Sequence, residues 1–164
     1  MIVEQNINID TTSETSRVRE ELTELLKGGF APLVILLREF HYDKAGIVLP
    51  GLPFSAWSLL KHMTHRQTIL LEFMREPQKY PDVWPDAYWP PSPLPESEFE
   101  WVNVIHLFEK DLEEMINIVN DSQRDLTAIH ENGKTLSWAA MTCLHHNAYT
   151  IGQIKIVGRQ LGVW

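Results

Sequence analysis

The chain has 164 residues, of which 44% are hydrophobic and 22% are charged, and its formal net charge is −8. These values are ordinary for a globular protein, and a chain of this length buries roughly 70% of its unfolded surface, so we predict one domain over residues 1–164. The acidic balance and the lack of any Lys/Arg-rich run argue against nucleic acid and anionic membranes as partners.

The sequence contains no feature of a secreted or membrane protein. Its single cysteine, Cys143, cannot form an internal disulfide. The N-terminal residues lack the basic start and apolar segment of a secretory signal, and no apolar stretch approaches the ~20 residues that cross a bilayer. We therefore expect a cytoplasmic protein, with residues 1–12 as a loosely ordered N-terminal segment.

The first quarter of the chain contains a helical pattern that two glycines interrupt. Apolar residues follow helical spacing at Val18, Leu22, Leu25 and Leu26. Because glycine is common at helix ends, we predict that this helix stops at Gly28 and Gly29. Residues 32–40 form a shorter helical piece that begins with a proline, and the Gly- and Pro-containing residues 41–54 are predicted to be a loop.

A second main helix is predicted to begin at Ser55, as N-cap, and to end near Arg75, before Pro77. Its apolar residues cover more than a narrow stripe, which indicates a central position in the fold. Residues 77–95 contain seven of the ten prolines, together with Trp84, Tyr88 and Trp89. We interpret this segment as an ordered, rigid crossover held on the surface by its aromatic rings.

Two further helices follow the crossover. Ser97 and Glu100 match a capping box, and the helix that it opens is predicted to run to about Asn120. Thr135 is the predicted N-cap of a last helix over about 136–160. Four helices, one long connection and no convincing alternating strand pattern predict an all-α fold, a four-helix bundle.

Histidines occur on two of these helices. The last helix contains the stretch MTCLHHNAYTIGQ, residues 141–153, in which His146 shares a face with Thr142, Cys143, Tyr149 and Thr150. The second main helix contains His62 and His65, one turn apart. If the two helices pack, imidazoles from both could meet in the core. The simpler interpretation is that each is a hydrogen-bonded core histidine.

Several separated segments are similar to one known family. GLPFSAWSLLKHM, the loop WPDAYWP, then HHNAYTIGQ and the closing RQLGVW resemble the DinB/YfiT-like family over roughly residues 20–164. The resemblance implies a four-helix bundle with a mononuclear metal site of three histidines. One ligand comes from the second helix and two from an HxxxH pair on the last. By position, these ligands are His62, His146 and Thr150, where the family has a third histidine.

The resemblance also implies an activity and a set of partners. Members of the family are linked to metal-dependent hydrolysis or to transfer reactions of small thiols, and they often dimerise. We therefore expect zinc, nickel or iron as cofactor, a small-molecule substrate, and a homodimer as a candidate assembly. Three imidazoles suit such ions, and zinc held in that way activates water in known enzymes.

The threonine at position 150 leaves the third ligand open, because a neutral hydroxyl is a weak ligand for these metals. Three substitutes come from the sequence: His65 on the same helix as His62, the thiolate of Cys143, or a carboxylate such as Glu39 or Asp43. The sequence does not choose among them.

Two functions therefore stay open after sequence analysis. The first is a metal-dependent hydrolase or thiol transferase that acts on a small molecule, with His62 and His146 as ligands. The second is a metal-free homologue that binds a small molecule or a protein partner without catalysis. Trp57, Tyr149 and Thr150 are candidate pocket residues, although core packing is the simpler role for the two aromatic side chains. His145 is expected to face a neighbouring helix or solvent.

Overall fold

The structure, a computed structural model, describes residues 11–79 and 88–164, with only the backbone for residues 11–14, 29–33 and 79. Within these ranges every regular element is helical and no strand occurs. The prediction of an all-α fold is therefore confirmed. The elements are α1 (Thr11–Glu39), α2 (Tyr42–Ala45), α3 (Ala56–Arg75), the short 3-10 helix η1 (Pro77–Lys79), α4 (Glu98–Asn120) and α5 (Leu136–Gln160).

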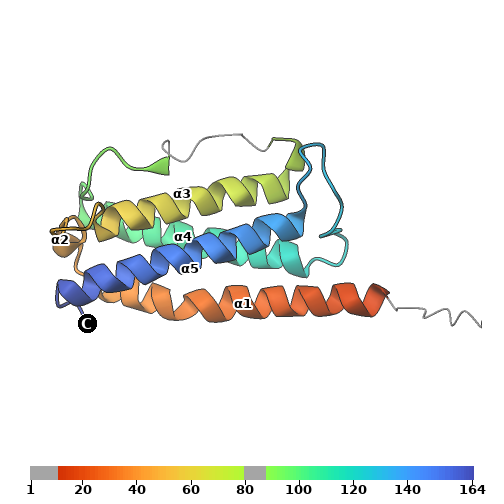
Figure 1. Ribbon diagram of the computed structural model, residues 1–164, viewed down its shortest axis with the longest axis horizontal. Helices are drawn as coiled ribbons and strands as arrows, with labels where there is room; N and C mark the ends of the chain where they lie inside the picture. Colours follow the sequence, from red (N-terminus) through yellow and green to blue (C-terminus); the bar gives the residue numbers. More distant parts are fainter. Residues whose placement is uncertain (1–10, 80–87) are drawn as a thin grey trace, which may run out of the picture.

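The four long helices lie alongside one another and enclose a single apolar core (Figure 1). Helix α3 packs most extensively against α5 and α4, and α1 covers the opposite sides of α4 and α5. The largest fully buried side chains include Phe73, Phe108, Leu26 and Met63. The central position predicted for the second main helix is therefore that of α3, which packs on both α4 and α5.

Side-chain caps fix where three of the helices begin. Ser55, Ser97 and Thr135 each accept a hydrogen bond from the backbone N–H of the residue three positions later. Such caps satisfy donors that the first turn of a helix leaves free, and each stabilises a helix by about 1 kcal/mol. The predicted bounds of α3, α4 and α5 are confirmed. The carboxylate of Glu100 accepts the N–H of Glu96 rather than that of the cap residue.

The predicted helix stop at Gly28 and Gly29 is wrong, because α1 continues without a break from Thr11 to Glu39. Buried apolar residues lie on both sides of the glycines, at Leu22 and Leu26 before them and at Leu37 after them. Burial of these apolar side chains outweighs the cost of roughly 1 kcal/mol that each glycine adds to a helix interior. Of the segment predicted to be loosely ordered, residues 11 and 12 begin α1, and residues 1–10 lie outside the described part.

The crossover between α3 and α4 is described from residue 88 onward, and Trp84 lies outside the described residues. Tyr88 is 4% exposed and packs on α3. The ring of Trp89 lies between two others, stacked on Phe54 at 3.7 Å and on His62 at 3.9 Å between ring centroids. Tyr88 and Trp89, the two aromatic residues in the described part of the crossover, therefore hold it against the helix that carries His62.

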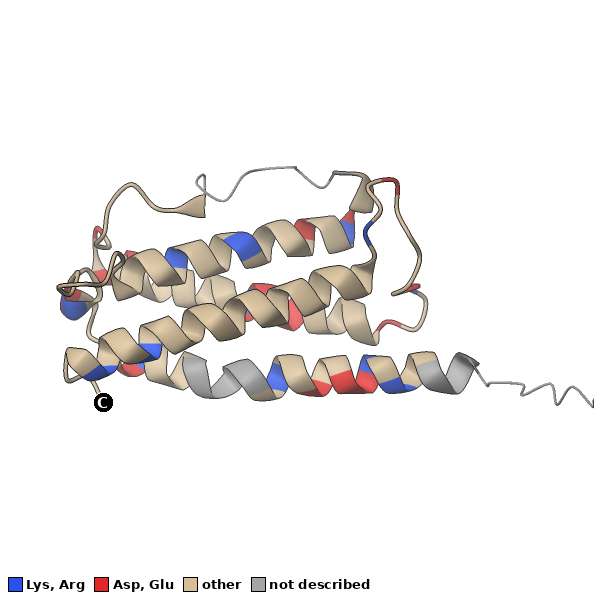
Figure 2. Cartoon of the chain, in the orientation of Figure 1, with Lys and Arg blue, Asp and Glu red and all other residues tan. Residues whose placement is uncertain are grey.

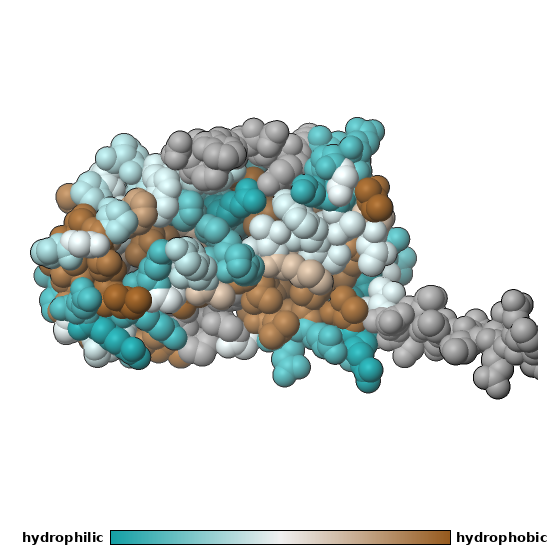
Figure 3. Space-filling view, viewed as in Figure 1, coloured by the Kyte–Doolittle hydropathy of each residue, from teal (hydrophilic) through white to brown (hydrophobic). Residues whose placement is uncertain are grey.

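Charge is unevenly distributed over the surface (Figure 2). Helix α1 carries many acidic and basic side chains, whereas α5 has two, Lys155 and Arg159, both in its C-terminal half. An apolar area lies between α5 and α1 on the face in view (Figure 3). Within the described residues, no helix combines the length and apolar character required to cross a bilayer.

The end of α5 depends on a close approach between Gly158 and the C-terminal Trp164. A Cβ atom on Gly158 would lie 2.4 Å from the Trp164 ring, whereas a Cβ on Gly152 would meet nothing within 4 Å. We expect Gly158→Ala to lower the unfolding free energy by about 1–2 kcal/mol through overpacking, and Gly152→Ala to raise it by roughly 0.5–1 kcal/mol through helix propensity. Urea unfolding of both variants measures this. Equal effects of the two substitutions would contradict the contact with Trp164.

Candidate functional site

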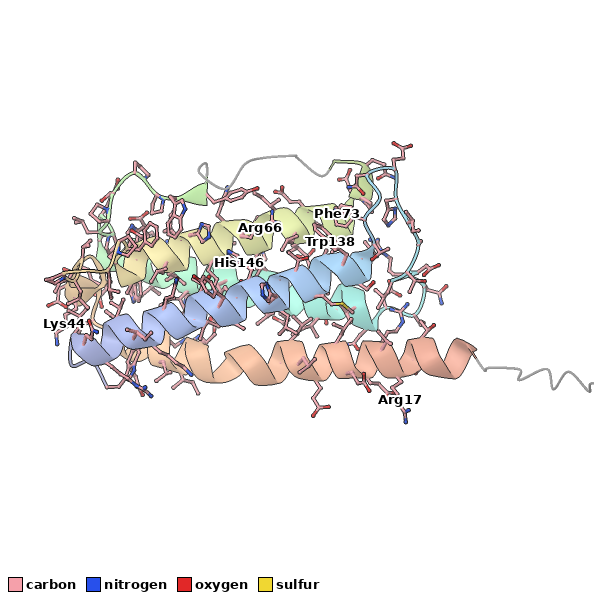
Figure 4. All side chains as sticks on the ribbon, viewed as in Figure 1. Arg17, Lys44, Arg66, Phe73, Trp138 and His146 are labelled. Carbon is pink, nitrogen blue, oxygen red and sulfur yellow. The ribbon has the colours of Figure 1, made fainter. Side chains whose placement is uncertain are left out.

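His62 of α3 and His146 of α5 meet at the interface of the two helices that pack most closely. Their Nε2 atoms are 3.0 Å apart and their ring centroids 4.9 Å apart. This is a hydrogen-bond distance, so in the neutral pair one Nε2 carries the proton and the other accepts it. The sequence-based expectation that imidazoles from the two helices meet inside the fold is therefore confirmed, and Figure 4 shows His146 on the side of α5 that faces α3.

Aromatic rings cover His62 on one side. The planes of His62 and Trp89 are nearly parallel, at 5°, and Phe54 continues the stack beyond Trp89 at 6°. Stacking of this kind holds the imidazole in one orientation and excludes water from that face. A pocket of about 310 Å³ lies beside the stack, with Thr64, His65 and Trp89 among its lining residues. That volume is at the lower end of the range for small-molecule sites.

Burial keeps both histidines neutral at pH 7. It lowers the pKa of His62 to about 4, with a further lowering by the neighbouring His146. Burial also lowers the pKa of His146, which the side chain of Asn147 partly opposes. Near His62, the Tyr88 backbone raises the pKa, although Nδ1 has no well-aligned hydrogen-bond partner among the described residues. Neutral imidazole is the form that binds metal ions.

Two buried amides form a network beside His146. Gln67 of α3 donates from Nε2 to the carbonyl oxygen of Phe108 in α4, at 2.7 Å. Asn147 of α5 donates from Nδ2 to Oε1 of Gln67, at 2.8 Å, and to the sulfur of Cys143, at 3.3 Å. The Oδ1 atom of Asn147 lies 3.5 Å from Nδ1 of His146. The network therefore links three helices to one of the two histidines.

Gln67 and Asn147 were not among the residues predicted from the sequence, although their positions carry a signal. Gln67 lies four residues after Met63 and three before Leu70, and both of these are fully buried. Asn147 lies four residues after the buried Cys143 and four before Ile151. A polar residue at a core position of an amphipathic helix is unusual, because it must find hydrogen-bond partners inside the protein.

Cys143 is a buried thiol beside the two histidine-bearing helices' amides. Its side chain is fully buried, and burial raises its pKa to about 12, so the sulfur keeps its proton at pH 7. The sulfur accepts from Asn147 at 3.3 Å and donates to Oε1 of Gln67 at 3.6 Å. In the metal-free protein Cys143 is therefore a neutral thiol bonded to the two amides, because a dry environment destabilises the charged form.

The structure does not bring the other suggested third ligands to the two histidines. Thr150 is 2% exposed, and its hydroxyl donates to the backbone oxygen of His146 at 2.9 Å. His65 is exposed and faces the Tyr88 ring at 5.2 Å. Glu39 and Asp43 are also exposed, at the end of α1 and on α2. Within residues 11–79 and 88–164, no three His, Cys, Asp or Glu side chains form a metal-binding group.

The remaining candidate residues lie away from the pair. Trp57 is 2% exposed and packs on Trp101 at 6.3 Å, in agreement with the simpler core role. Tyr149 does not line the pocket, because it lies on the outer face of α5 with 67% of its surface exposed. His145 is exposed, as expected.

A cation that sequence analysis did not single out lies close to the histidines. Arg66 follows His62 by one helical turn, and its guanidinium carbon is 5.7 Å from the centre of the Tyr88 ring. Its charge lowers the pKa of both His62 and His146. Figure 4 shows Arg66 and His146 at the same level of the bundle, on facing helices. The site therefore combines two neutral imidazoles with one permanent positive charge.

The two facing Nε2 atoms suit a metal ion after a small movement. In a tetrahedral zinc site with Zn–N bonds of about 2.0–2.1 Å, two ligand nitrogens are about 3.4 Å apart. The observed separation between His62 and His146 is 3.0 Å. An opening of about 0.4 Å, within the reach of side-chain rotation, gives that spacing. The described donor set is thus two imidazoles, with the remaining coordination positions open to water or a ligand.

Comparison with known proteins identifies no relative. No family model, no curated protein and no solved structure matches this chain.

The lowered pKa of His62 predicts that metal-free protein is destabilised by acid. Because the folded pKa, about 4, lies below the ordinary value of 6.5, the unfolded chain takes up a proton first as the pH falls. Stability is therefore complete above about pH 6.5 and is lost toward pH 4. After allowance for solvent around a half-buried ring, we expect the wild type to lose about 1–2 kcal/mol more than His62→Gln over this range.

Urea unfolding with a chelator, at a series of pH values, measures this difference. His106→Gln is the matched control, because His106 is exposed and pairs with Glu109 at 3.2 Å on the surface of α4. If wild type and His62→Gln lose stability in parallel while His106→Gln also follows the wild type, burial of His62 does not couple its protonation to folding.

Proposed function

We propose that this chain is a DinB/YfiT-like protein with a four-helix bundle, in which His62 and His146 hold a divalent transition metal ion. The observation that carries the proposal is the pair of Nε2 atoms that face each other at 3.0 Å from two different helices. Both imidazoles are held neutral by burial, as metal ligands require. The segments that resemble the family, GLPFSAWSLLKHM and HHNAYTIGQ, are those that carry these two residues.

The proposed reaction is hydrolysis of a small molecule or transfer of a small thiol. Zinc, nickel or iron bound by imidazoles supplies Lewis acidity to the groups that fill its open positions. The protein's own residues supply the surroundings. His62 is held by the stack on Trp89, and Arg66 adds a fixed positive charge one turn away. The pocket beside Trp89, which neither His62 nor His146 lines, is the proposed binding place of the small molecule, next to the ring that covers His62.

A metal-free binding protein is the second candidate, and Thr150 favours it. Its hydroxyl is already satisfied by a backbone oxygen of its own helix, so it offers a proposed ion no charged donor. The hydrogen bond between His62 and His146 also satisfies both Nε2 atoms without any ion. In this case the bundle and its pocket would bind a small molecule or a protein partner without catalysis.

Metal analysis separates the two candidates. We expect protein purified without an affinity tag, incubated with zinc, nickel or iron(II) and then dialysed, to keep about one ion per chain. His62→Ala and His146→Ala should each lose most of it, since each removes half of the described donor set. His106→Ala, at an exposed position, should keep it. The measurement is elemental analysis of each dialysed sample, with circular dichroism to verify folding.

The three outcomes have different meanings. Loss of the ion in both site variants, but not in the control, supports the metal site. Loss in all three variants, or in none, would show that the ions bind elsewhere on the surface. A folded wild-type protein that retains no ion would overturn the proposal in favour of the metal-free alternative.

Thr150→His tests whether the position one turn after His146 still faces the site. A histidine there adds a third imidazole on the same helix face, and we expect the zinc affinity to rise by about tenfold or more. Competition with a chromophoric chelator measures the affinity, and circular dichroism establishes that the variant is folded. Tyr149→His is the matched control, because its side chain lies on the outer face of α5. An equal gain in both variants would contradict the proposed geometry.

A further inference from the structure

We propose that Asn147 and Gln67 are positioning residues that fix the tautomer of His146, with its proton on Nδ1 and its Nε2 lone pair facing His62. The inference deepens the proposed function, on which its relevance to metal binding rests. Its central statement, however, concerns the metal-free protein and can be tested without any ion. All the atoms that carry it belong to residues that the structure describes.

The carbonyl oxygen of Phe108 can only accept a hydrogen bond. Gln67, with 0% of its surface exposed, therefore directs its NH₂ group toward this oxygen, at 2.7 Å. Its Oε1 atom is then fixed on the opposite side of the amide and faces α5. A backbone carbonyl thus decides the orientation of the first amide, which side-chain contacts alone would leave ambiguous.

The orientation of the Asn147 amide follows from that of Gln67. Asn147 is also 0% exposed, and the group that it presents to Oε1 of Gln67 at 2.8 Å must be its NH₂. The other hydrogen of this NH₂ points to the sulfur of Cys143, at 3.3 Å. Both donors of Asn147 are therefore used, and its Oδ1 is left as the atom that faces Nδ1 of His146, at 3.5 Å.

The Oδ1 atom of Asn147 determines which nitrogen of His146 carries the proton. Because Oδ1 of Asn147 only accepts, the favourable arrangement has the proton of His146 on Nδ1. Its Nε2 then bears a lone pair, so in the metal-free pair His62 donates from its own Nε2 in the bond of 3.0 Å, and Nδ1 of His62, which has no well-aligned partner among the described residues, carries the lone pair. Metal-binding histidines in proteins commonly donate their second N–H to such an outer partner, which sets the tautomer and orients the ring.

The contact of 3.5 Å is long for a hydrogen bond, so the orientation of the amide matters more than the strength of the contact. A reversed Asn147 would turn its one NH₂ group toward Nδ1 of His146 and its Oδ1 toward Oε1 of Gln67, so that two acceptors would face each other and Gln67 would lose this donor. Buried polar atoms without partners cost about 1–3 kcal/mol each. The network therefore holds one orientation of Asn147, and a single tautomer of His146 follows.

The experiment determines the histidine tautomers in the metal-free protein directly. Histidine-labelled protein, prepared with a chelator at about pH 8, is studied by two-bond ¹H–¹⁵N correlation, which distinguishes the protonated nitrogen of each ring. His146→Gln and His62→Gln assign the two sets of signals. We expect His146 as a single Nδ1–H tautomer and His62 with its proton on Nε2.

Three variants test the role of the network. Asn147→Leu removes the acceptor and should convert His146 to a mixture of tautomers or to Nε2–H, with zinc affinity lowered about 10–100-fold. Asn147→Asp keeps an acceptor toward Nδ1 and should keep the Nδ1–H tautomer. Gln67→Leu frees the Asn147 amide to reverse and should also give a mixture. Asn103→Leu, at an exposed position of α4, is the control and should change nothing.

If the amides had only a structural role, their substitution would lower the stability of the fold without changing the tautomer of His146. The proposal is overturned if wild-type His146 carries its proton on Nε2, or if folded Asn147→Leu keeps a pure Nδ1–H signal. If the variants are unfolded, the wild-type spectrum alone decides, because it must show the Nδ1–H tautomer.

A wild type with the expected tautomer that binds no zinc supports the positioning role while the metal proposal fails. Zinc bound tightly by both wild type and Asn147→Leu would leave the metal site in place and overturn the role of Asn147.

Discussion

The packing of α5 against α3 is the contact on which the candidate site depends, because the two helices divide its polar groups between them. His62 and Gln67 lie on α3, and His146 and Asn147 on α5. Two hydrogen bonds, of 3.0 Å between the imidazoles and 2.8 Å between the amides, join the two pairs. Since neighbouring residues on a helix are separated by about 100°, a rotation of α5 by one residue would break both bonds.

The same bonds therefore specify the helix register and the geometry of the site. Apolar packing between α3 and α5 is large but tolerant of small shifts, because many arrangements of Leu, Ile and Met bury similar areas. The buried amides are not tolerant in this way, since each must be fully satisfied. Their anchor is the carbonyl oxygen of Phe108 in α4, which fixes α3 relative to a third helix. The precision of the pair His62–His146 is thus set by groups outside the pair.

Much of the fold could be predicted from local sequence chemistry, because short-range hydrogen bonds decide where helices begin. Ser55, Ser97 and Thr135 gave correct starts for three helices, since a capping side chain acts within three residues. The helix end predicted at the two glycines of α1 was wrong for the opposite reason. Their effect on a helix is local and small, and the long-range burial of residues such as Leu37 exceeds it.

The candidate site was predictable in part. Helical spacing and the family resemblance brought His62 and His146 to attention, and the structure places them in contact. Spacing alone could not assign the faces of α5 finely enough, and so Tyr149 was expected in the core or at a pocket although it faces outward. The roles of Asn147 and Gln67 depend on a backbone oxygen of a third helix, which is distant in sequence from both. No pattern along one helix contains that information.

Thr150 and the two imidazoles differ in their effect on the stability of the fold. Thr150 leaves no buried hydroxyl without a partner, because it donates to the carbonyl of His146 from a buried position. The imidazoles of His62 and His146 do carry a cost, since burial lowers their pKa values and couples folding to deprotonation. A pair of leucines would fill the interface without this loss of stability in acid. A core built for packing alone has no need of two facing imidazoles and a hydrogen-bonded amide pair beside them. This asymmetry favours a site that uses its two imidazoles.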